Sequence, residues 1–578
     1  MTGHLVRQTQ GGTTIKLHRG ERKCLIGLDL DRSNATDDFV GFALEFREPG
    51  NGSWKRVWNR LRFSYDGLTE DEIRAGAPST VAPIQKFRWV HFPFEPRDGE
   101  YRYRATPMYM RADGSLVRGQ AVEAAIDLSH ETIRDILDVG FTRGYASSQA
   151  YADAERFPCQ ARILPPPGSA PPADLDHDMS TCQREYAWLG FEGRATIYQL
   201  LDEALADPSV TVDAMLYELR EPMIVGKLEA LGSRLRAIVD NHDAQGDPTS
   251  NESIACDRFT AAGAAVKRGK FGRQQHNKVV VLRRNGTPYK ALAGSTNFTL
   301  RGLYVQSNNT IVFRDTKATA LFGAVFERYF AIIDKRGAAG AFHRDPLSQV
   351  WHDCTPAGGP VIRIAISPHE DPALALDPVV DAVEQAESSV LYAVVFLNQL
   401  SGRVRDTLEE LVKHRSTFSY GIAQRTGGLS VFKPDGSRGL VSFAYLAEDA
   451  PEPFAAEWSS HAGGNSRSNV LHHKFVVTDF NTPRARVFTG SSNMAKGGER
   501  DNGDHLIMIE DGRVATAYAV EALRTFDHFH FRVAMNEADR KRQVLKLATP
   551  PAPGGPTWFR EVYVPGHIKA RDRLLFSA

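Results

Sequence analysis

Cysteine is scarce in this sequence and shows no ligand or crosslink pattern. The 578 residues contain five cysteines, at Cys24, Cys159, Cys182, Cys256 and Cys354. Their number is odd and no two have CxxC spacing, so we expect reduced structural cysteines, with neither a zinc site nor a disulfide framework.

The sequence also lacks long apolar segments. No run of about 18 apolar residues occurs, and the N-terminus MTGHLVRQTQGGTTIKL has no apolar core of a secretory signal. These absences predict a cytoplasmic protein without a transmembrane segment. Secretion by a signal-independent route would leave the same pattern, and a peripheral membrane contact needs only an interfacial patch.

The sequence also has no formal net charge. Lys and Arg together number 70, and so do Asp and Glu. No global field therefore draws the protein toward nucleic acid or an anionic membrane, and any attraction must come from local patches.

One passage of the sequence is present twice. It reads QHNKVVVLRRNGTPYKALAGSTN from Gln275 and LHHKFVVTDFNTPRARVFTGSSN from Leu471. Each copy has His-x-Lys, a β-branched run and then Gly-Ser-x-Asn, and the two copies keep one register of 196 residues (472 − 276 = 196) for more than fifty positions. A single His-x-Lys would mean little, but two in one register indicate an internal duplication.

The repeated residues have the chemistry of a phosphate site. Strand alternation places His and Lys of each triplet on one face, and the Asn follows a glycine turn that can return it to that face. Lysines and amides neutralise and bind phosphate oxygens, while imidazoles attack phosphorus and donate protons. The candidate catalytic residues are His276, Lys278, Asn297, His472, Lys474 and Asn493.

These motifs resemble the phospholipase D superfamily, whose signature is HxKxxxxD followed by GSxN. The resemblance covers roughly residues 185 to 545. The second copy has the full signature with Asp479, whereas the first has Arg283 at that position. A further family element, Asn-x-Glu, is present as Asn502 and Asp504 in the second half, while the first half has Gln306 and Asn308 there.

The resemblance implies that two facing halves build one active site, and that a histidine forms a covalent phosphohistidine intermediate. It also implies activity without a cofactor or metal, and a monomer suffices because one chain holds both motifs. Residues expected to support the site are Asp479, Asp504, Asn308, Ser295 and Ser491.

The same resemblance predicts the roles of the two histidines. We expect Asp504 to orient His472 and Asn308 to orient His276, each within its own half. A carboxylate stabilises imidazolium, so His472 would be the general acid and His276 the nucleophile.

The fold class expected is α/β, with two similar α/β/α phospholipase D-like half-domains that have mixed sheets, preceded by an all-β immunoglobulin-like sandwich. The predicted domains are a β-sandwich accessory domain at 1–128, a helix and Pro-rich linker at 129–184, a first half at 185–358 and a second half with the C-terminal tail at 359–578. SHETIRDIL from Ser129 predicts the helix, and ILPPPGSAPPADLDHD predicts a stiff extended spacer.

Several interpretations remain open. Phospholipid is ranked narrowly first as substrate, for hydrolysis or transfer; the alternatives are a metal-independent nuclease or DNA-end-processing phosphodiesterase, and an inactive phosphate-binding repeat protein. The pair His528 and His530 would share a strand face, which allows a metal site but has no acidic or Cys partner. Residues upstream of the two motifs that could attract phosphate are Lys267, Arg268, Lys270, Arg273, Trp458, His461 and Arg467.

Overall fold

The computed structural model describes residues 3–166, 168–395, 397, 402–413, 417–425, 428–448, 450–452, 454–455 and 470–578. The chain forms two compact units. The first, here called the β unit, comprises residues 1–130, 516–524 and 531–578. The second, the motif unit, comprises residues 131–515 and 525–530 and holds both copies of the repeated passage.

The β unit contains two larger antiparallel sheets and a two-stranded one, β6-β7. The larger sheets have the strand orders β1-β2-β3-β8 and β10-β9-β4-β5, with β11 also paired to β9. The bounds are β1 Leu5–Gln10, β2 Thr13–Gly20, β3 Lys23–Leu30, β8 Arg88–His91, β4 Phe39–Arg47, β5 Lys55–Arg56, β9 Glu100–Met110, β10 Leu116–Arg118 and β11 Val122–Asp127; β6 (Trp58–Asn59), β7 (Ala77–Pro78) and α1 (Glu70–Ala75) lie between them in sequence. Ile26 from one sheet and Phe42 and Tyr103 from the other share one apolar core. The sheets therefore pack face to face, whereas an immunoglobulin-like class stays a prediction.

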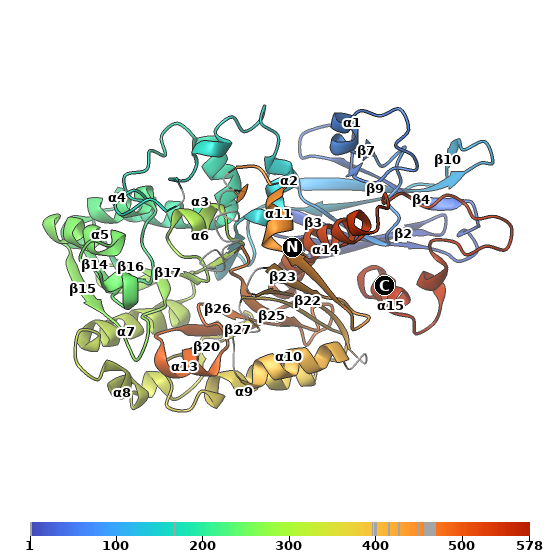
Figure 1. The fold of residues 1–578 in the computed structure, drawn as a ribbon. Coiled ribbons are helices and arrows are strands. Elements are labelled where there is room, and N and C mark those ends of the chain that lie inside the picture. Colours follow the sequence, from blue (N-terminus) through green and yellow to red (C-terminus); the bar gives the residue numbers. More distant parts are fainter. Residues whose placement is uncertain are drawn as a thin grey trace. The chain divides into compact units, whose positions relative to one another are not determined.

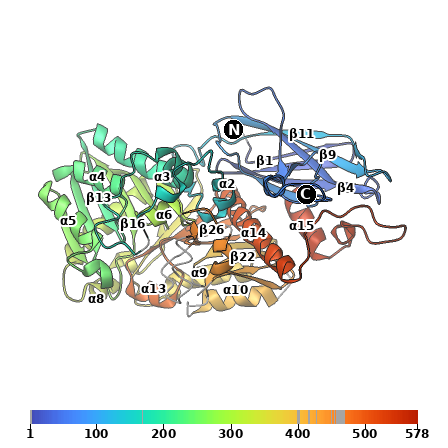
Figure 2. The same cartoon turned by 45° about the horizontal axis from the view of Figure 1, so that its top comes forward.

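The C-terminal tail belongs to the β unit. Phe559 and Val562 are buried in the core between the sheets, and helix α15 (Ile568–Ser577) packs on β3. Figure 2 shows α15 next to the strands of this unit. His18 Nε2 lies 2.8 Å from the carbonyl oxygen of Phe576. This tail was predicted to belong to the second half, but its apolar side chains complete the sandwich core instead.

The motif unit has two mixed sheets of related topology. The first has the order β12-β18-β17-β16-β13-β14-β15 and the second β19-β20-β27-β26-β25-β21-β22-β23-β24. In each, parallel strands (β13, β14 and β15 in the first sheet, β21 and β22 in the second) lie beside an antiparallel series (β16, β17, β18 and β25, β26, β27). Mixed sheets in both halves are what the sequence predicted.

The strands of the first sheet are β12 Leu137–Phe141, β13 Val210–Leu216, β14 Leu235–Asp240, β15 Ala265–Gly269, β16 Lys278–Arg284, β17 Thr287–Gly294 and β18 Asn309–Phe313. Those of the second are β19 His352–Asp353, β20 Val361–Ile366, β21 Ser389–Val394, β22 Phe418–Arg425, β23 Gly428–Phe432, β24 Arg438–Ser442, β25 Lys474–Thr478, β26 Arg486–Gly490 and β27 His505–Glu510. Strands β16 and β25 both begin at the motif lysine, so the duplicated sequence folds into equivalent strands.

Helices cover the two sheets. Figure 1 shows α4 and α5 beside β14 and β15, and α9 with α10 along the second sheet. Asp315 illustrates how a helix begins here, because its carboxylate accepts hydrogen bonds from the backbone N–H of Lys317 and Ala318 at the start of α7. The bounds are α2 Ser148–Tyr151, α3 Gln183–Ala206, α4 Pro222–Ala230, α5 Asn251–Ala261, α6 Leu300–Tyr304, α7 Thr316–Ile332, α8 Ala338–His343, α9 Ala373–Glu384, α10 Arg403–Lys413, α11 Phe443–Glu448, α13 Lys496–Asp501 and α14 Gly512–Arg540. Within the described part of the chain, no helix has the length and apolar character needed to cross a membrane.

The helix predicted from Ser129 is wrong. Residues 131–136 form turns, and β12 follows, paired antiparallel with β18 at the edge of the first sheet. Thr132 N donates to Asp138 Oδ1 at 3.1 Å, and Val139 N donates to Thr132 Oγ1 at 2.9 Å. The backbone thus finds its partners in the sheet, and this tertiary pairing outweighs the helical pattern of the sequence.

The predictions of an extended spacer and of reduced cysteines are also wrong in part. Cys159 and Cys182 form a disulfide with a Cα–Cα distance of 5.7 Å, while Cys24, Cys256 and Cys354 are free and buried. Since the disulfide joins the two ends of the Pro-rich segment, that segment folds back on itself. The 23-residue separation gave no sequence signal for this pairing.

His528 and His530 lie on helix α14 rather than on a strand. Residues two apart on a helix do not share a face, so the geometry on which a shared metal site depended is absent. His528 instead packs edge-on against Tyr145, with ring centroids 5.7 Å apart.

Candidate active site

Each motif histidine is held by the backbone of the other half. His276 precedes β16, and its N–H donates to the carbonyl oxygen of Gly503 at 2.8 Å. His472 precedes β25, and its N–H donates to the carbonyl oxygen of Ser307 at 3.1 Å. Parallel bridges Gln275–Gly503 and Ser307–Leu471 continue the same contact. These two exchanges are related by the 196-residue register, so they form a pseudo-twofold seam between the halves.

The side-chain partners of the histidines cross the same seam. His276 Nδ1 donates to Asp504 Oδ1 at 2.7 Å. His472 Nδ1 donates to Asn308 Oδ1 at 2.8 Å. The predicted pairing within each half is therefore wrong. Asp504 directly follows Gly503, whose carbonyl oxygen binds the N–H of His276. Its carboxylate therefore lies beside His276 of the first half and not beside His472 of its own half.

The Gly-Ser turns fix the residues that orient the histidines. Ser295 Oγ donates to Asn308 Oδ1 at 2.8 Å, and Ser491 Oγ donates to Asp504 Oδ1 at 2.6 Å. The preceding glycines, Gly294 and Gly490, have positive φ, and a Cβ at either would collide with a backbone carbonyl oxygen of the neighbouring strand. Glycine is therefore required where β17 and β26 end, and the serine that follows supports the crossed pair.

Comparisons with known proteins give likenesses of low identity. No protein-family model matches the sequence, and no curated protein sequence does either. Among solved structures, polyphosphate kinase from Porphyromonas gingivalis is similar at 15% identity and TM-score 0.34, over 56% of this chain and only 46% of the kinase. Phosphatidylserine synthase from Haemophilus influenzae is similar at 12% identity and TM-score 0.41, over 61% of this chain and 92% of the synthase. The phospholipase D family member Nuc from Salmonella typhimurium is similar at 20% identity and TM-score 0.20, over 23% of this chain and 86% of Nuc.

These likenesses, all under 25% identity and with TM-scores below 0.5, carry no inference about activity. The resemblance to the phospholipase D superfamily rests on the two motif sets of the sequence.

The two motif lysines are buried and contact the motif histidines. Lys278 Nζ donates to the carbonyl oxygen of His276 at 2.5 Å and lies 4.6 Å from the ring centroid of Tyr217. Lys474 Nζ donates to the carbonyl oxygen of His472 and approaches His472 Nε2, both at 3.0 Å. Burial lowers the pKa of Lys278 to about 7 despite nearby carboxylates. Burial and the charge of Lys278 lower the pKa of Lys474 well below its ordinary value.

The surroundings lower the pKa of both motif histidines. Burial and the Lys278 ammonium lower the pKa of His276 to about 4, although Asp504 opposes the shift. Burial and the Lys474 ammonium lower the pKa of His472 well below its ordinary value. Burial opposes the ionisation of Asp504, yet contact with His276 and the charge of Lys278 hold its pKa below the usual range. An ionised Asp504 therefore holds the Nδ1–H tautomer of His276 and leaves Nε2 with a lone pair.

Asp479 serves the second sheet rather than the phosphate site. Its Oδ1 accepts backbone N–H bonds from Glu387, Ser388 and Ser389 at 2.7–3.2 Å at the start of β21. In the first half, Arg283 Nε donates instead to Asp213 Oδ2 at 2.5 Å. In the first half, an ion pair between Arg283 and Asp213 on the sheet thus stands where the second half has Asp479. Neither Arg283 nor Asp213 is a hydrogen-bond partner of the His276 or His472 side chain.

The motif asparagines differ in their surroundings. Asn297 Nδ2 donates to Glu218 Oε2 at 2.7 Å. The amide oxygens of Asn297 and Asn493 are both buried without a hydrogen-bond partner among the described residues. Glu218, which lies two positions after β13, was not among the site residues predicted from the sequence. Its position, an acidic residue just after an apolar strand, was the signal that could have indicated it.

Asp240 and Gln424 were missed as well. Asp240, the last residue of β14, accepts from the N–H of Gln275 at 2.6 Å. Gln424, near the end of β22, accepts from the N–H of Val470 at 2.9 Å and of Leu471 at 3.2 Å. Each side chain therefore fixes the residue before a motif histidine. Burial raises the pKa of Asp240 to about 7.

Two of the basic residues upstream of the first motif, Lys267 and Arg268, already have partners within the protein. Lys267 pairs with Asp334 at 2.9 Å, and Arg268 donates to Ser253 Oγ at 2.9 Å and to the carbonyl oxygen of Asp240 at 3.1 Å. Trp458, His461 and Arg467, upstream of the second motif, lie outside the described residues.

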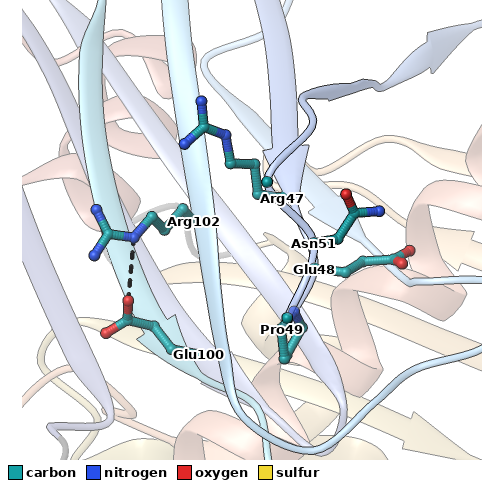
Figure 3. Close-up of a pocket in the computed structure, with 8 residues that line it drawn as sticks. Arg47, Glu48, Pro49, Asn51, Glu100 and Arg102 are labelled. Atoms are coloured by element: carbon teal, nitrogen blue, oxygen red, sulfur yellow. Dashed lines mark hydrogen bonds and ion pairs between the residues drawn. The ribbon is translucent and has the colours of Figure 1, made fainter.

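The β unit has a separate concavity of about 440 Å³ between the end of β4 and the start of β9. Figure 3 shows Arg47 and Arg102 beside Glu48 and Glu100, and Arg102 Nε donates to Glu100 Oε1 at 3.2 Å. The Arg47 guanidinium stacks 4.4 Å from the ring centroid of Trp54. Because these cations are already engaged and no nucleophile or histidine lines the concavity, we assign no chemistry to it.

Proposed function

We propose that this protein is a phosphodiesterase of the phospholipase D type, which hydrolyses or transfers a phosphodiester through a covalent phosphohistidine. The crossed pairing of His276 with Asp504 and of His472 with Asn308 is the observation that carries the proposal. It presents two oriented imidazoles next to two buried lysines in one site. We infer that one chain is sufficient for activity, because both halves contribute to each histidine.

His276 acts as the nucleophile. Its Nε2 lone pair attacks phosphorus, the P–N bond forms, and the bond from phosphorus to the leaving oxygen breaks. The imidazole becomes positively charged in this step, and the Asp504 carboxylate on Nδ1 stabilises that charge, as an aspartate does for histidine in a hydrolase triad.

His472 supplies the proton that the leaving oxygen takes. Burial and the charge of Lys474 lower the pKa of His472, and a phosphate anion bound between the lysines opposes that shift and favours the protonated imidazole. Water then enters, His472 takes its proton, and the resulting hydroxide breaks the P–N bond. The products are an alcohol and a phosphomonoester, and an alcohol in place of water gives transfer.

Lys278 and Lys474 stabilise the nonbridging oxygens as charge develops in the transition state. Asn297 and Asn493 add amide donors from the two Gly-Ser-x-Asn turns. None of these steps requires a metal, and a cation next to two ammonium groups would be repelled. We retain phospholipid as the favoured substrate and a nucleic-acid diester as the alternative.

Purified protein assayed on bis(p-nitrophenyl) phosphate with excess EDTA tests the proposal. We expect undiminished hydrolysis and a labelled phosphohistidine at His276 after acid-free quenching. Phosphatidylcholine vesicles and single- and double-stranded DNA, assayed in parallel, rank the substrates. Loss of activity on chelation with recovery in a divalent ion, or label on His472 with His276 unmodified, would contradict the mechanism. Phosphate binding without turnover of any diester would favour an inactive repeat.

A further inference from the structure

Glu499 places a buried carboxyl behind the second Gly-Ser-x-Asn turn. It lies on α13 and is 1% exposed. The hydroxyl of Ser492, in that turn, donates to Glu499 Oε1, and Ser492 Oγ accepts from the backbone N–H of Met494 at 2.9 Å. Met494 has a φ of 55°, in the left-handed region that a residue with a side chain rarely adopts. The backbone on both sides of Asn493 is therefore held through the carboxyl of Glu499.

The other oxygen of this carboxyl faces His369. The Nδ1 of His369 lies 2.6 Å from the carbonyl oxygen of Ser348, which only accepts, so Nδ1 carries the ring proton. Nε2 then has a lone pair, and it is buried without a hydrogen-bond partner among the described residues. It lies 3.4 Å from Glu499 Oε2. An ionised carboxylate would set lone pair against lone pair here, whereas a proton on Glu499 supplies the donor that Nε2 lacks.

The charges around the pair favour a proton on the carboxyl. Burial raises the pKa of Glu499 to about 8, against the hydrogen bond from Ser492. Burial lowers the pKa of His369 to about 4, against its bond to the Ser348 carbonyl. At neutral pH the proton therefore lies on Glu499. The other titratable groups that face the pair are Asp504, which raises the pKa of Glu499, and His343, His352 and Asp371, of which the histidines lower the pKa of His369 and the aspartate raises it.

The first half has different residues at these two places. By the 196-residue register, Leu303 stands where the second half has the acid. Thr142 and Ser367 are equivalent, because each hydroxyl binds the backbone of the segment that ends in a histidine-orienting residue. Two residues after them the chain has Gly144 and His369. A leucine and a glycine thus suffice for the fold, and the acid with its acceptor is a feature of the second turn.

We propose that Glu499 and His369 share one buried proton that positions the second Gly-Ser-x-Asn turn, and that loss of this proton lowers the rate of the proposed reaction. Both are positioning residues, because they act through the turn. As the pH rises, hydroxide removes the proton, and Glu499 becomes a carboxylate that faces an unprotonated nitrogen. The proposal rests on the proposed function and adds a regulation of that same site by pH.

The turn transmits this change to the nucleophile. Ionised Glu499 is repelled by the carboxylate of Asp504. Ser491 donates to Asp504 Oδ1 at 2.6 Å. The same oxygen accepts from His276 Nδ1 at 2.7 Å. A shift of Ser492 displaces its neighbour Ser491, and with it the carboxylate that orients His276. Misplacing a reacting group by about 1 Å is enough to cost about 100-fold in rate.

Glu499→Gln tests the shared proton, because a carboxamide copies the protonated acid. Its oxygen accepts from Ser492, and its NH₂ group donates to His369 Nε2. Dividing kcat of this variant on bis(p-nitrophenyl) phosphate by the wild-type value cancels every pH dependence that both proteins share, including that of Lys278. We expect a ratio near 1 below about pH 7 and near tenfold at about pH 9, since only the wild type loses the required proton. Glu384→Gln, at the exposed end of α9, should keep a ratio near 1 throughout.

Infrared spectroscopy separates failure of the shared proton from failure of the proposed function, because it needs no turnover. The difference between wild type and Glu499→Gln should contain the C=O band of a protonated carboxyl, and this band should disappear as the pH rises through about 8. If no diester is hydrolysed but the band behaves in this way, the shared proton is supported and the enzyme proposal fails. If diesters are hydrolysed and the ratio of kcat values stays near 1 at every pH, the shared proton is overturned and the enzyme proposal stands.

Two further outcomes concern the roles of the pair. A Glu499→Gln rate that is reduced by one factor at every pH would show a purely structural carboxyl and would overturn the proposal. Should Glu499→Gln not fold, His369→Phe decides the question. Loss of the Nε2 acceptor should shift the carboxyl band to higher wavenumber, and an unshifted band would show that the acid is not bonded to His369.

Discussion

His276 and Asp504 are 228 residues apart in the chain, and 2.7 Å separates the Nδ1 of one from the Oδ1 of the other. The 196-residue register relates this pair to a second one, in which Asn308 of the first half accepts from His472 of the second. A first-half histidine thus depends on a second-half carboxylate, and a second-half histidine on a first-half amide. The two halves are therefore not independent sites, and substitutions should act across the seam.

Replacing Asp504 with Asn should slow the nucleophilic attack of His276 on phosphorus. The amide carries no charge to stabilise the imidazolium and can turn its NH₂ group toward Nδ1, which favours the wrong tautomer, so we expect phosphoenzyme formation to slow by about 10³–10⁴-fold. Rapid quenching of a labelled diester measures this rate. Asp381→Asn, at an exposed position on α9, is the matched control. Phosphoenzyme formed by Asp504→Asn at the wild-type rate would show that the pair has no part in nucleophilic attack.

Replacing Asn308 with Asp should help His472 keep its proton. A carboxylate on Nδ1 raises the pKa of the imidazole, so the general acid remains protonated to higher pH. The alkaline limb of kcat should move up by about one pH unit for an ester with an alkyl leaving group. The limb for p-nitrophenyl esters should move less, since p-nitrophenolate leaves without a proton. A downward shift for the alkyl ester would argue against His472 as the acid.

Substrate capture should weaken above neutral pH. The pKa of Lys278 is lowered to about 7, so the ammonium is charged below that pH and is lost as the pH rises through it. Burial favours loss of the Lys278 proton. The carboxylates that face Lys278, those of Asp504, Glu218 and Asp240, oppose this loss. We expect kcat/KM of wild type to fall above about pH 7. In Lys278→Arg this limb should disappear, because guanidinium stays charged, even if the plateau is lower. Lys317→Arg, on the exposed start of α7, serves as the control, and a limb that persists in Lys278→Arg would assign it to another group.

Asp479 should matter for stability more than for chemistry. Asp479→Ala removes a carboxylate that accepts backbone N–H bonds from Glu387, Ser388 and Ser389. We expect the free energy of unfolding of the motif unit to fall by about 2–3 kcal/mol in urea titrations. The folded enzyme should keep kcat within about threefold of wild type, a narrow range relative to the effect of removing a triad member. A rate loss above about 100-fold with unchanged stability would instead place Asp479 in the chemistry.

The β unit can be weakened without touching the motifs. Phe559 is 1% exposed and packs against Phe39, with ring centroids 5.4 Å apart. Phe559→Ala should lower stability by about 3–5 kcal/mol, measured by thermal unfolding, while hydrolysis of a small diester continues. Trp58→Ala, at a side chain that is 54% exposed, should change little. Loss of small-diester hydrolysis in a folded Phe559→Ala protein would link the sandwich to catalysis. Deleting residues 1–160 is a poorer test, since it also removes β12 from the first motif sheet.

The sequence by itself determined the duplication, the candidate catalytic set and the alternation of helices and strands in two halves. These features are local or periodic: a His-x-Lys triplet before a β-branched run and a Gly-Ser turn can be recognised without knowing where the chain goes next. The glycines of the turns could also be predicted, because Gly294 and Gly490 are the residues that tolerate positive φ close to a neighbouring carbonyl.

Tertiary structure decided which partner each histidine has. Sequence spacing suggested Asp504 for His472, but the backbone seam joins Gln275 to Gly503 and Leu471 to Ser307, so the next residues meet across the halves. Tertiary structure also determined the conformation of the segment after Ser129, because pairing of β12 with β18 outweighed the helical pattern. It likewise placed Cys159 next to Cys182, so that the two form a disulfide. Glu218 and Asp240 could not be ranked above other acidic residues from sequence, because their significance depends on the groups that the two sheets place beside them. Local patterns follow from the chain's own geometry, whereas partners that are distant in sequence are chosen by which backbone hydrogen bonds and buried surfaces the whole fold can satisfy together.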